Sequence, residues 1–70
     1  MAVLKVIEVL ASSKIGWEDA AKNAVKVASK SLKAIRSVYV KEQSAVVEEG
    51  EIKEFRVNAK ITFEVLEGED

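Results

Sequence analysis

The sequence predicts an α+β domain, residues 1–70, in which a three-stranded antiparallel sheet packs on one amphipathic helix in the order β-α-β-β. Residues 53–65 alternate between apolar and polar side chains, which is typical of a strand. Residues 17–32 repeat apolar side chains at spacings of three and four, which is typical of a helix. Gly50 separates residues 53–65 from a second strand-like segment and favours a hairpin. A chain of this length makes one domain.

The alternation over residues 53–65 is the strongest of these signals, and only Lys53 breaks it. Its apolar members are Phe55, Val57, Ala59, Ile61, Phe63 and Val65; its polar members are Glu54, Arg56, Asn58, Lys60, Thr62 and Glu64. Successive side chains of a strand point to opposite faces, so one face of this strand is apolar and the other is polar. At about 3.3 Å per residue the strand is roughly 43 Å long, longer than one small helix can cover. We therefore expect part of its surface to meet something other than water.

Residues 2–11 predict the first strand. They are rich in Val, Leu and Ile, and Lys5 and Glu8 lie three positions apart and so point to opposite faces. Both faces of this strand are mainly apolar, as expected for a strand with neighbours and cover. Ser12, Ser13 and Gly16 then interrupt the pattern. Either Gly16 or Ser13 is expected to cap the helix that follows.

Residues 17 to about 32 predict one amphipathic helix. Its apolar stripe consists of Trp17, Ala20, Ala21, Ala24, Val25, Ala28, Leu32 and Ile35. The alanines allow a close approach to the sheet, and Trp17 is expected to lie in the core rather than to serve as a stacking platform. Glu18 and Asp19 fall in the first turn, and Lys30 and Lys33 fall near the last turn, which complements the helix dipole.

Residues 35–47 predict the second strand, and the turn at Glu48, Glu49 and Gly50 returns the chain antiparallel. One parity carries Val38, Val40 and Val46; the other carries Ser37, Tyr39, Lys41 and Gln43. The helix is expected to cover Val38 and Val40 of this segment together with Phe55, Val57, Ile61 and Phe63. The opposite face then carries Ser37, Tyr39, Lys41, Gln43, Arg56, Asn58, Lys60 and Thr62, and we expect neighbouring copies of the chain to cover it. The acidic end at Glu67, Glu69 and Asp70 is expected to fray.

The composition excludes several classes of protein. A chain that is 49% hydrophobic and 33% charged is typical of a folded domain. Its net charge of −1 argues against a nucleic-acid-binding protein, which normally carries a basic excess. No apolar run approaches 18 residues, so we expect no membrane partner, and we expect a cytoplasmic protein. Histidine and cysteine are absent, which removes the usual catalytic nucleophile pairs and predicts that the protein is not an enzyme.

Two charged clusters have both a functional and a structural interpretation. Glu48, Glu49, Glu51 and Glu54 gather near the turn and offer oxygen ligands to calcium, but they lack the Asp/Asn loop of a dedicated calcium site, so we favour a solvated turn. Lys22, Lys26 and Lys30 share one helix face and would suit an anion or an acidic partner. A solvated face is favoured there too, because Glu18 stands at the right spacing to pair with Lys22.

Arg56 and Tyr39 are the most informative residues of the polar face. A guanidinium in the middle of a strand needs a partner, and we weigh an inter-subunit salt bridge against contact with an anionic or planar ligand. Tyr39 is interpreted either as a surface residue or as an aromatic at an interface or ligand pocket.

The segments of this chain resemble the dodecin family. The resemblance rests on the β-α-β-β order, on Lys5-Val6-Ile7-Glu8, on Ser12-Ser13 followed by Trp17-Glu18-Asp19-Ala20, and on Phe55-Arg56-Val57 leading to Ile61-Thr62-Phe63-Glu64-Val65. Members of that family are small non-enzymatic proteins that form hollow homododecamers, and many store flavins between subunits. The resemblance therefore implies a homododecamer with a small-molecule ligand.

The same resemblance implies a cofactor site at Ser37, Val38, Tyr39 and Arg56, altered at two positions. Flavin-binding members have a stacking tryptophan where this chain has Ser37, and a glutamine where it has Arg56. One stacked ring is worth about 1–3 kcal/mol, so binding of riboflavin, FMN or FAD is expected to be weakened about 5- to 150-fold or lost. A subgroup without the tryptophan has been linked to calcium, which gives the alternative of a calcium-binding or purely structural dodecin, although no metal ligand can be matched residue by residue.

Overall fold

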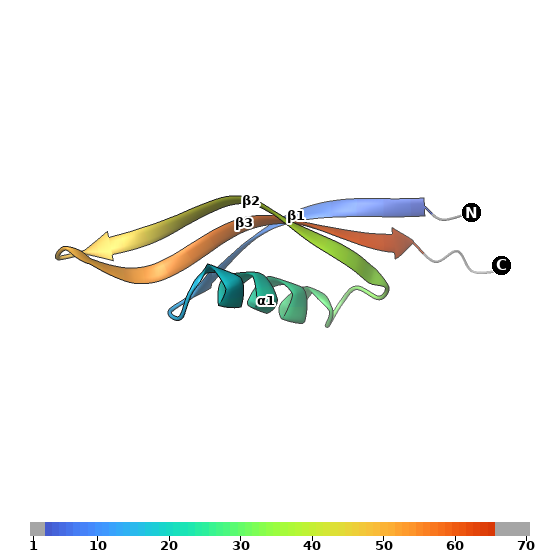
Figure 1. The fold of residues 1–70 in the computed structure, drawn as a ribbon. Helices are drawn as coiled ribbons and strands as arrows, with labels where there is room; N and C mark the ends of the chain where they lie inside the picture. Colours follow the sequence, from blue (N-terminus) through green and yellow to red (C-terminus); the bar gives the residue numbers. More distant parts are fainter. Residues whose placement is uncertain (1–2, 66–70) are drawn as a thin grey trace.

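The computed structural model describes residues 3–65 and contains four elements (Figure 1). These are β1 (Val3–Ser13), α1 (Trp17–Ala28), β2 (Ile35–Glu48) and β3 (Glu51–Val65). The predicted β-α-β-β order is confirmed. Ala2 and the acidic residues Glu67, Glu69 and Asp70 lie outside the described residues. Among residues 3–65, no helix is both long and apolar enough to cross a membrane.

The sheet is antiparallel with β3 in the centre, in the order β1-β3-β2. β1 pairs with β3 along its whole length, from Val3 opposite Val65 to Ser13 opposite Phe55. The first strand is therefore longer than the sequence predicted, because Ser12 and Ser13 find partners on β3. The strand with the strongest alternation in the sequence, β3, is the central strand and pairs with both β1 and β2.

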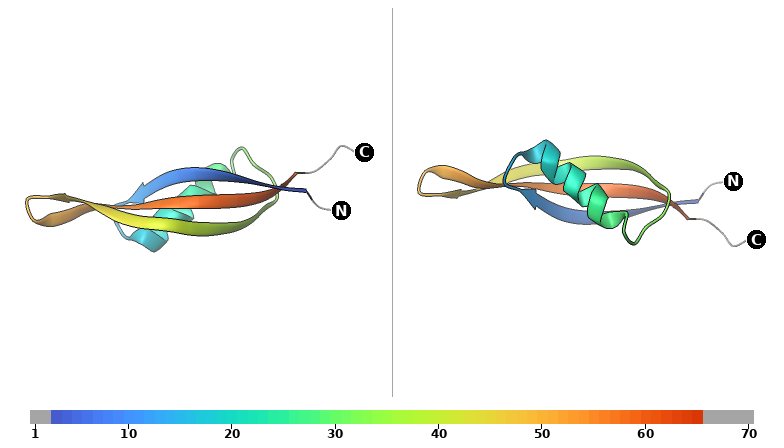
Figure 2. Two further views of the ribbon diagram at one scale, coloured as in Figure 1. Left: turned by 90° about the horizontal axis from the view of Figure 1, so that it is seen from above. Right: turned by 90° about the horizontal axis from the view of Figure 1, so that it is seen from below.

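Helix α1 lies across one face of the sheet, which we call the inner face (Figure 2). The buried core consists of Ala20 and Ala24 from α1 and Val57, Ala59 and Ile61 from β3. Alanines on the helix and at position 59 allow the helix to approach the sheet closely. The apolar parity of β3 faces the helix, as predicted.

Trp17 fixes the N-terminal end of α1 on the sheet. Its ring meets the ring of Phe55 edge to face, with centroids 4.9 Å apart. Its indole Nε1–H donates a hydrogen bond of 2.8 Å to the backbone oxygen of Ser44 on β2. Trp17 packs against Phe55, but it is only partly buried, so it lies at the edge of the core rather than within it.

Ser13 organises the turn before the helix. Its Oγ accepts hydrogen bonds from the backbone N–H of Ile15 at 2.9 Å and of Gly16 at 3.4 Å, and its hydroxyl donates to Asp19 Oδ2 at 2.7 Å. Gly16 occupies the N-cap position but has no side chain to cap with. The two predicted capping residues therefore divide the task, since the carbonyl of Gly16 accepts from the N–H of Ala20 at 3.0 Å and Ser13 supplies the side-chain hydrogen bonds.

Helix α1 ends at Ala28, four residues before the predicted end at Leu32. The N–H groups of Ser31 and Leu32 both donate to the carbonyl of Ala28, which closes the helix in tight turns. Ala34 then adopts a positive φ of 60° as the chain reverses into β2. The apolar spacing continued past the helix because Ile35, the last member of the predicted stripe, begins the next strand.

The register of β2 shifts at three places, and one shift corrects a prediction. Val40 pairs with Ala59, but Glu42 pairs with Asn58, so Lys41 is an extra residue in the strand. This bulge reverses the parity that follows. Gln43 therefore lies opposite Val57 on the inner side, and its predicted place on the polar face was wrong.

The far end of the β2–β3 hairpin extends beyond α1 as an arm, which we define as residues 46–54 (Figures 1 and 2). Its turn places Glu49 at φ 52° and Gly50 at φ 79°. Two successive positive φ values are typical of the tight hairpin turns that match strand twist. The arm contributes to an elongated molecule of 56 × 19 × 13 Å.

Candidate functional site

The sheet face that α1 leaves uncovered, the outer face, carries the polar parity of β3. In the centre stand Arg56, Asn58, Lys60 and Thr62, flanked by Glu8, Leu10 and Ser12 of β1 and by Ser37, Tyr39, Glu42 and Ser44 of β2. These side chains share a face because paired residues of neighbouring strands point the same way. Leu10 and Tyr39 are 81% and 64% exposed, which indicates that this surface is covered by another molecule.

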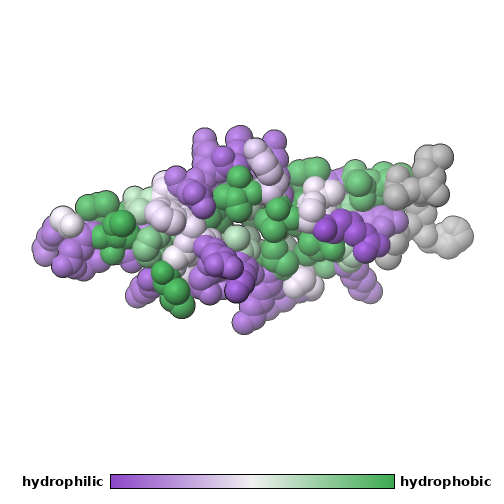
Figure 3. Space-filling model, viewed as in Figure 1, coloured by the Kyte–Doolittle hydropathy of each residue, from purple (hydrophilic) through white to green (hydrophobic). Residues whose placement is uncertain are grey.

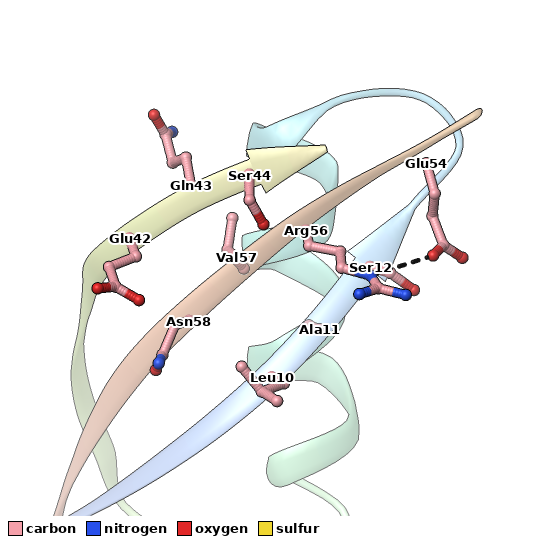
Figure 4. Close-up of a pocket in the computed structure, with 10 residues that line it drawn as sticks. All are labelled: Leu10, Ala11, Ser12, Glu42, Gln43, Ser44, Glu54, Arg56, Val57 and Asn58. Atoms are coloured by element: carbon pink, nitrogen blue, oxygen red, sulfur yellow. Dashed lines mark hydrogen bonds and ion pairs between the residues drawn. The ribbon is translucent and has the colours of Figure 1, made fainter. Parts of the chain in front are cut away.

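A groove of about 680 Å³ lies on this face at one end of the sheet, and we call it the Arg56 groove. Figure 4 shows its lining, which consists of Leu10, Ala11, Ser12, Glu42, Gln43, Ser44, Glu54, Arg56, Val57 and Asn58. The side chain of Arg56 is 58% exposed, and its Nε lies 3.4 Å from Glu54 Oε1. One long contact leaves most of the five guanidinium N–H groups available to another acceptor.

Asn58 gives the groove a second polar feature. Its Oδ1 is buried and accepts no hydrogen bond from residues 3–65. Its side chain hydrogen-bonds to Glu8, and this bond, together with Lys41 Nζ at 3.6 Å from Glu8 Oε2, lowers the pKa of Glu8. A buried acceptor without a donor is costly, so a ligand that donates a hydrogen bond there would be favoured.

The four predicted site residues do not meet within one chain. Ser37 lies opposite Thr62, and Tyr39 lies opposite Lys60, both on the outer face. Thr62 and Arg56 are six positions apart on β3, which is about 20 Å at 3.3 Å per residue. Val38 points the other way, toward the inner side, because it pairs with Ile61. A ligand that touches both Ser37 and Arg56 would therefore need residues from two copies of the chain.

Sequence reasoning missed the residues that complete the Arg56 groove. Ser12 and Leu10 reach it from β1, because β1 rather than β2 lies on that side of β3. Glu42 reaches it only because the bulge at Lys41 reverses the parity of β2. Pairing residues 2–11 with the central strand when the sequence alone was considered would have found the β1 residues of the groove. Nothing in the sequence indicates the bulge at Lys41.

The lysine cluster lies outside the Arg56 groove, and of the acidic cluster only Glu54 lines it. Within the described part of the chain, no group of three or more acidic residues comes together in a way that would hold a metal ion. The expected ion pair of Glu18 with Lys22 is not among the salt bridges of residues 3–65, and Lys22, Lys26 and Lys30 are all exposed.

Comparison with known proteins identifies the family. Residues 3–66 match the family described as Dodecin, which is nearly the whole chain. The chain belongs to the dodecin family. The calcium dodecin of Mycobacterium tuberculosis is 34% identical over 65 residues, covering 93% of this chain and 92% of that protein. Dodecins are non-enzymatic binding proteins, so the prediction that this protein is not an enzyme is confirmed.

Solved dodecins share the fold closely. A point mutant of the Thermus thermophilus dodecin superimposes with a TM-score of 0.90 at 30% identity, covering 96% of this chain and 98% of that one. The Streptomyces coelicolor dodecin gives 0.91 at 28% identity, with 96% of each chain covered. The M. tuberculosis calcium dodecin, described as having a novel calcium-binding site, gives 0.80 at 33% identity and 97% coverage of both chains. These matches confirm the α+β fold with its three-stranded antiparallel sheet.

Proposed function

We propose that this chain is the subunit of a hollow homododecamer that binds and stores a small ligand on the outer face of its sheets. The observation that carries the proposal is the Arg56 groove, in which the exposed Arg56 side chain and the buried Asn58 Oδ1 stand together on a face that no other element of residues 3–65 covers. Family membership supports the assembly, since dodecins are homododecamers. A cytoplasmic location belongs to the same proposal.

The ligand is held between copies of the chain. Ser37 and Arg56 lie about 20 Å apart on one outer face, so they reach one ligand only when two outer faces come together. This arrangement also explains why large apolar side chains such as Leu10 stay exposed in a single chain. Packing against a second outer face would bury them.

The groove suits a planar ligand with hydrogen-bonding edges, and a flavin is the first candidate. The pyrimidine edge of a flavin ring has carbonyl acceptors for Arg56 and an N–H donor for Asn58 Oδ1. Ser37 offers no ring to stack on the flavin, so affinity is lower than in dodecins with a tryptophan there. One stacking contact corresponds to about 1–3 kcal/mol.

Titration of riboflavin, FMN and FAD against the assembled protein, followed by flavin fluorescence, tests this proposal. Ser37→Trp is expected to tighten binding about 5- to 150-fold, and Arg56→Ala is expected to weaken it. Ser31→Trp, at an exposed position outside the outer face, is the matched control and should leave affinity unchanged. Binding that ignores both Ser37→Trp and Arg56→Ala would show that the Arg56 groove is not the site.

Calcium is the second candidate, supported by the 34% identity with the calcium dodecin of M. tuberculosis. Calcium takes about six to eight oxygen ligands, and the carboxylates that line the groove are Glu42 and Glu54. Since two carboxylates do not complete such a site, copies of the chain or water would supply the rest. Calorimetric titration with calcium should give heat in the wild type but not in E42Q/E54Q, and E48Q/E51Q serves as the control. Equal heats in both variants would rule out this site.

A further inference from the structure

The lysines of α1 form a charged cluster that the outer face does not use. Pairing of Lys22 with Glu18 was the reason to expect a solvated face, but that ion pair is not found among residues 3–65. Between Asp19 and Glu42 the sequence has no acidic residue, although the net charge of the whole chain is −1. The basic residues of this stretch are Lys22, Lys26, Lys30, Lys33, Arg36 and Lys41. Positive charge is therefore concentrated on the helix and on the segment that follows it.

An apolar groove lies beside these lysines, between α1 and β2, and we call it the helix groove. It has a volume of about 390 Å³ and is lined by Glu18, Ala21, Lys22, Val25, Lys26 and Val38. Its floor is made by the apolar members of this set, of which Val38 is 38% exposed. Lys22 and Lys26 are exposed, and neither forms an ion pair within residues 3–65. Figure 3, which views the β2 side of the molecule, shows hydrophobic surface between hydrophilic side chains over α1 and β2.

The helix groove exists because α1 crosses the sheet obliquely (Figure 2). At the start of the helix, Trp17 donates its hydrogen bond to the Ser44 backbone oxygen of β2. Further along, Asn23 Nδ2 donates a hydrogen bond of 3.2 Å to the Ser12 backbone oxygen of β1. The helix thus moves away from β2 and toward β1, and it leaves the inner side of β2 near Val38 only partly covered. An apolar sheet face is stable when a second layer covers it, so this position has room for another helix.

The charges along the helix groove follow a fixed order, which is Glu18, Lys22 and Lys26. Residues four apart on a helix are about 6 Å apart along its axis. A second helix that lies beside α1 has the same spacing, so residues four apart on it can pair with all three charges. Ala21 and Val25 have short side chains, which suits the axis separation of about 8–10 Å typical of packed helices. The groove follows about 12 Å of α1, so two to three turns of a partner helix would fill it.

We propose that the helix groove binds a short amphipathic acidic helix of another protein, with its apolar side chains on the groove floor and its acidic side chains beside Lys22 and Lys26. Opposite Glu18 the partner carries a basic residue. An inorganic polyanion fits less well, because it has no apolar atoms for the floor. A second copy of α1 does not supply this helix, because its apolar side, with Ala20 and Ala24 buried, is packed on its own sheet. The contact uses no residue of the Arg56 groove.

Fluorescence anisotropy of a labelled synthetic peptide tests the proposal at low ionic strength. The peptide has about 15 residues, with Lys, Glu and Glu at four-residue spacing and leucines along the adjacent edge. The wild type is expected to bind it, and K22E/K26E is expected to bind it at least about tenfold more weakly. K14E/K53E changes the net charge by the same amount at exposed positions outside the groove and should bind like the wild type. No binding by the wild type, or equal binding by K22E/K26E, would overturn the proposal.

Two further arms separate a specific contact from misfolding and from simple charge attraction. K22E/K26E should prefer a peptide in which both glutamates are replaced by lysines, which a misfolded variant would not do. Val38→Thr places a hydroxyl on the apolar floor and should weaken peptide binding at least about twofold, with no effect on binding of inorganic polyphosphate. Polyphosphate that binds the wild type as tightly as the peptide does, together with an unchanged Val38→Thr, would contradict the proposal. Flavin or calcium titration of K22E/K26E should match the wild type, so the two proposals fail independently.

Discussion

The two faces of β3 differ as much as two faces of one strand can. On the inner face, Val57, Ala59 and Ile61 are 1%, 0% and 0% exposed beneath α1. On the outer face, the side chain of Arg56 is 58% exposed, although it alternates with those same residues. Because the side chains of β3 alternate, one half of them lies in the closed core and the other half lies on the open outer face.

This difference separates the residues that stabilise the fold from the residues that are available for assembly and ligand binding. Beneath α1 the inner face is closed within one chain, because one helix and the apolar parity of one strand exclude water together. Within residues 3–65, the outer face has a buried acceptor without a donor in Asn58, an exposed Leu10 and a guanidinium with one long contact to Glu54. We therefore expect inner-face substitutions to change stability and outer-face substitutions to change assembly and binding.

The largest effect is expected at Ile61, which is fully buried. Ile61→Ala removes three methyl or methylene carbons from a closed core and should lower the free energy of unfolding by about 2–5 kcal/mol. Urea denaturation at one fixed protein concentration measures it, because assembly shifts apparent stability. Thr62→Ala, one residue along on the outer face, should cost less than about 1 kcal/mol. Similar losses in the two variants would remove the distinction between the faces.

Ser13 and Ser12 repeat this comparison on β1, where Ser13 is 7% exposed and Ser12 is exposed. Ser13→Ala removes the acceptor of two backbone N–H groups and the donor to Asp19, and should destabilise the chain by about 1–2 kcal/mol. Ser12→Ala should cost only a few tenths. Thermal unfolding at one protein concentration measures both. A Ser12→Ala loss equal to that of Ser13→Ala would contradict the assigned role of Ser13.

The inner face was predictable from the sequence because buried side chains recur at the regular spacing of the strand or helix that carries them. The alternation of residues 53–65 gave the central strand and its buried parity, and the alanine stripe gave the helix that covers it. The end of the helix was misplaced because Leu32 and Ile35 kept the spacing after the backbone had turned. Apolar spacing reports which side chains are buried, and it does not report where backbone hydrogen bonds stop.

The outer face was only partly predictable, because its arrangement depends on pairing between strands. Ser37, Tyr39 and Arg56 were placed on one face, but their separation along β3 emerged only from the register. Gln43 was misplaced by a bulge that adds one residue without changing composition. Ser12 was absent from the predicted site because strand order decides which residues flank Arg56, and alternation within a strand carries no such information.

Trp17 offers a smaller test at the edge of the inner face. Trp17→Phe keeps an aromatic ring against Phe55 but removes the Nε1–H that donates to the Ser44 backbone oxygen. A hydrogen bond of this kind contributes about 1 kcal/mol, and the smaller ring adds some lost packing. Chemical denaturation followed by far-ultraviolet circular dichroism would show it, since the chain has no other tryptophan. An unchanged midpoint would mean that this hydrogen bond contributes nothing to holding β2 on the helix.

The smallest expected effect lies on the outer face, at Glu8. The hydrogen bond from Asn58 and the charge of Lys41 lower the pKa of Glu8 below its ordinary value of 4.5. A carboxyl with a lowered folded-state pKa stabilises the fold above its unfolded pKa and loses that contribution as the pH falls through the folded value. Wild type should therefore exceed Glu8→Gln in urea midpoint at pH 7, and the gap should close below about pH 4.5. High salt should narrow the gap at pH 7, because the pair with Lys41 is exposed. A gap that persists unchanged into acid would show that Glu8 acts through packing, and the outer face would then contribute to stability in the same way as the inner face.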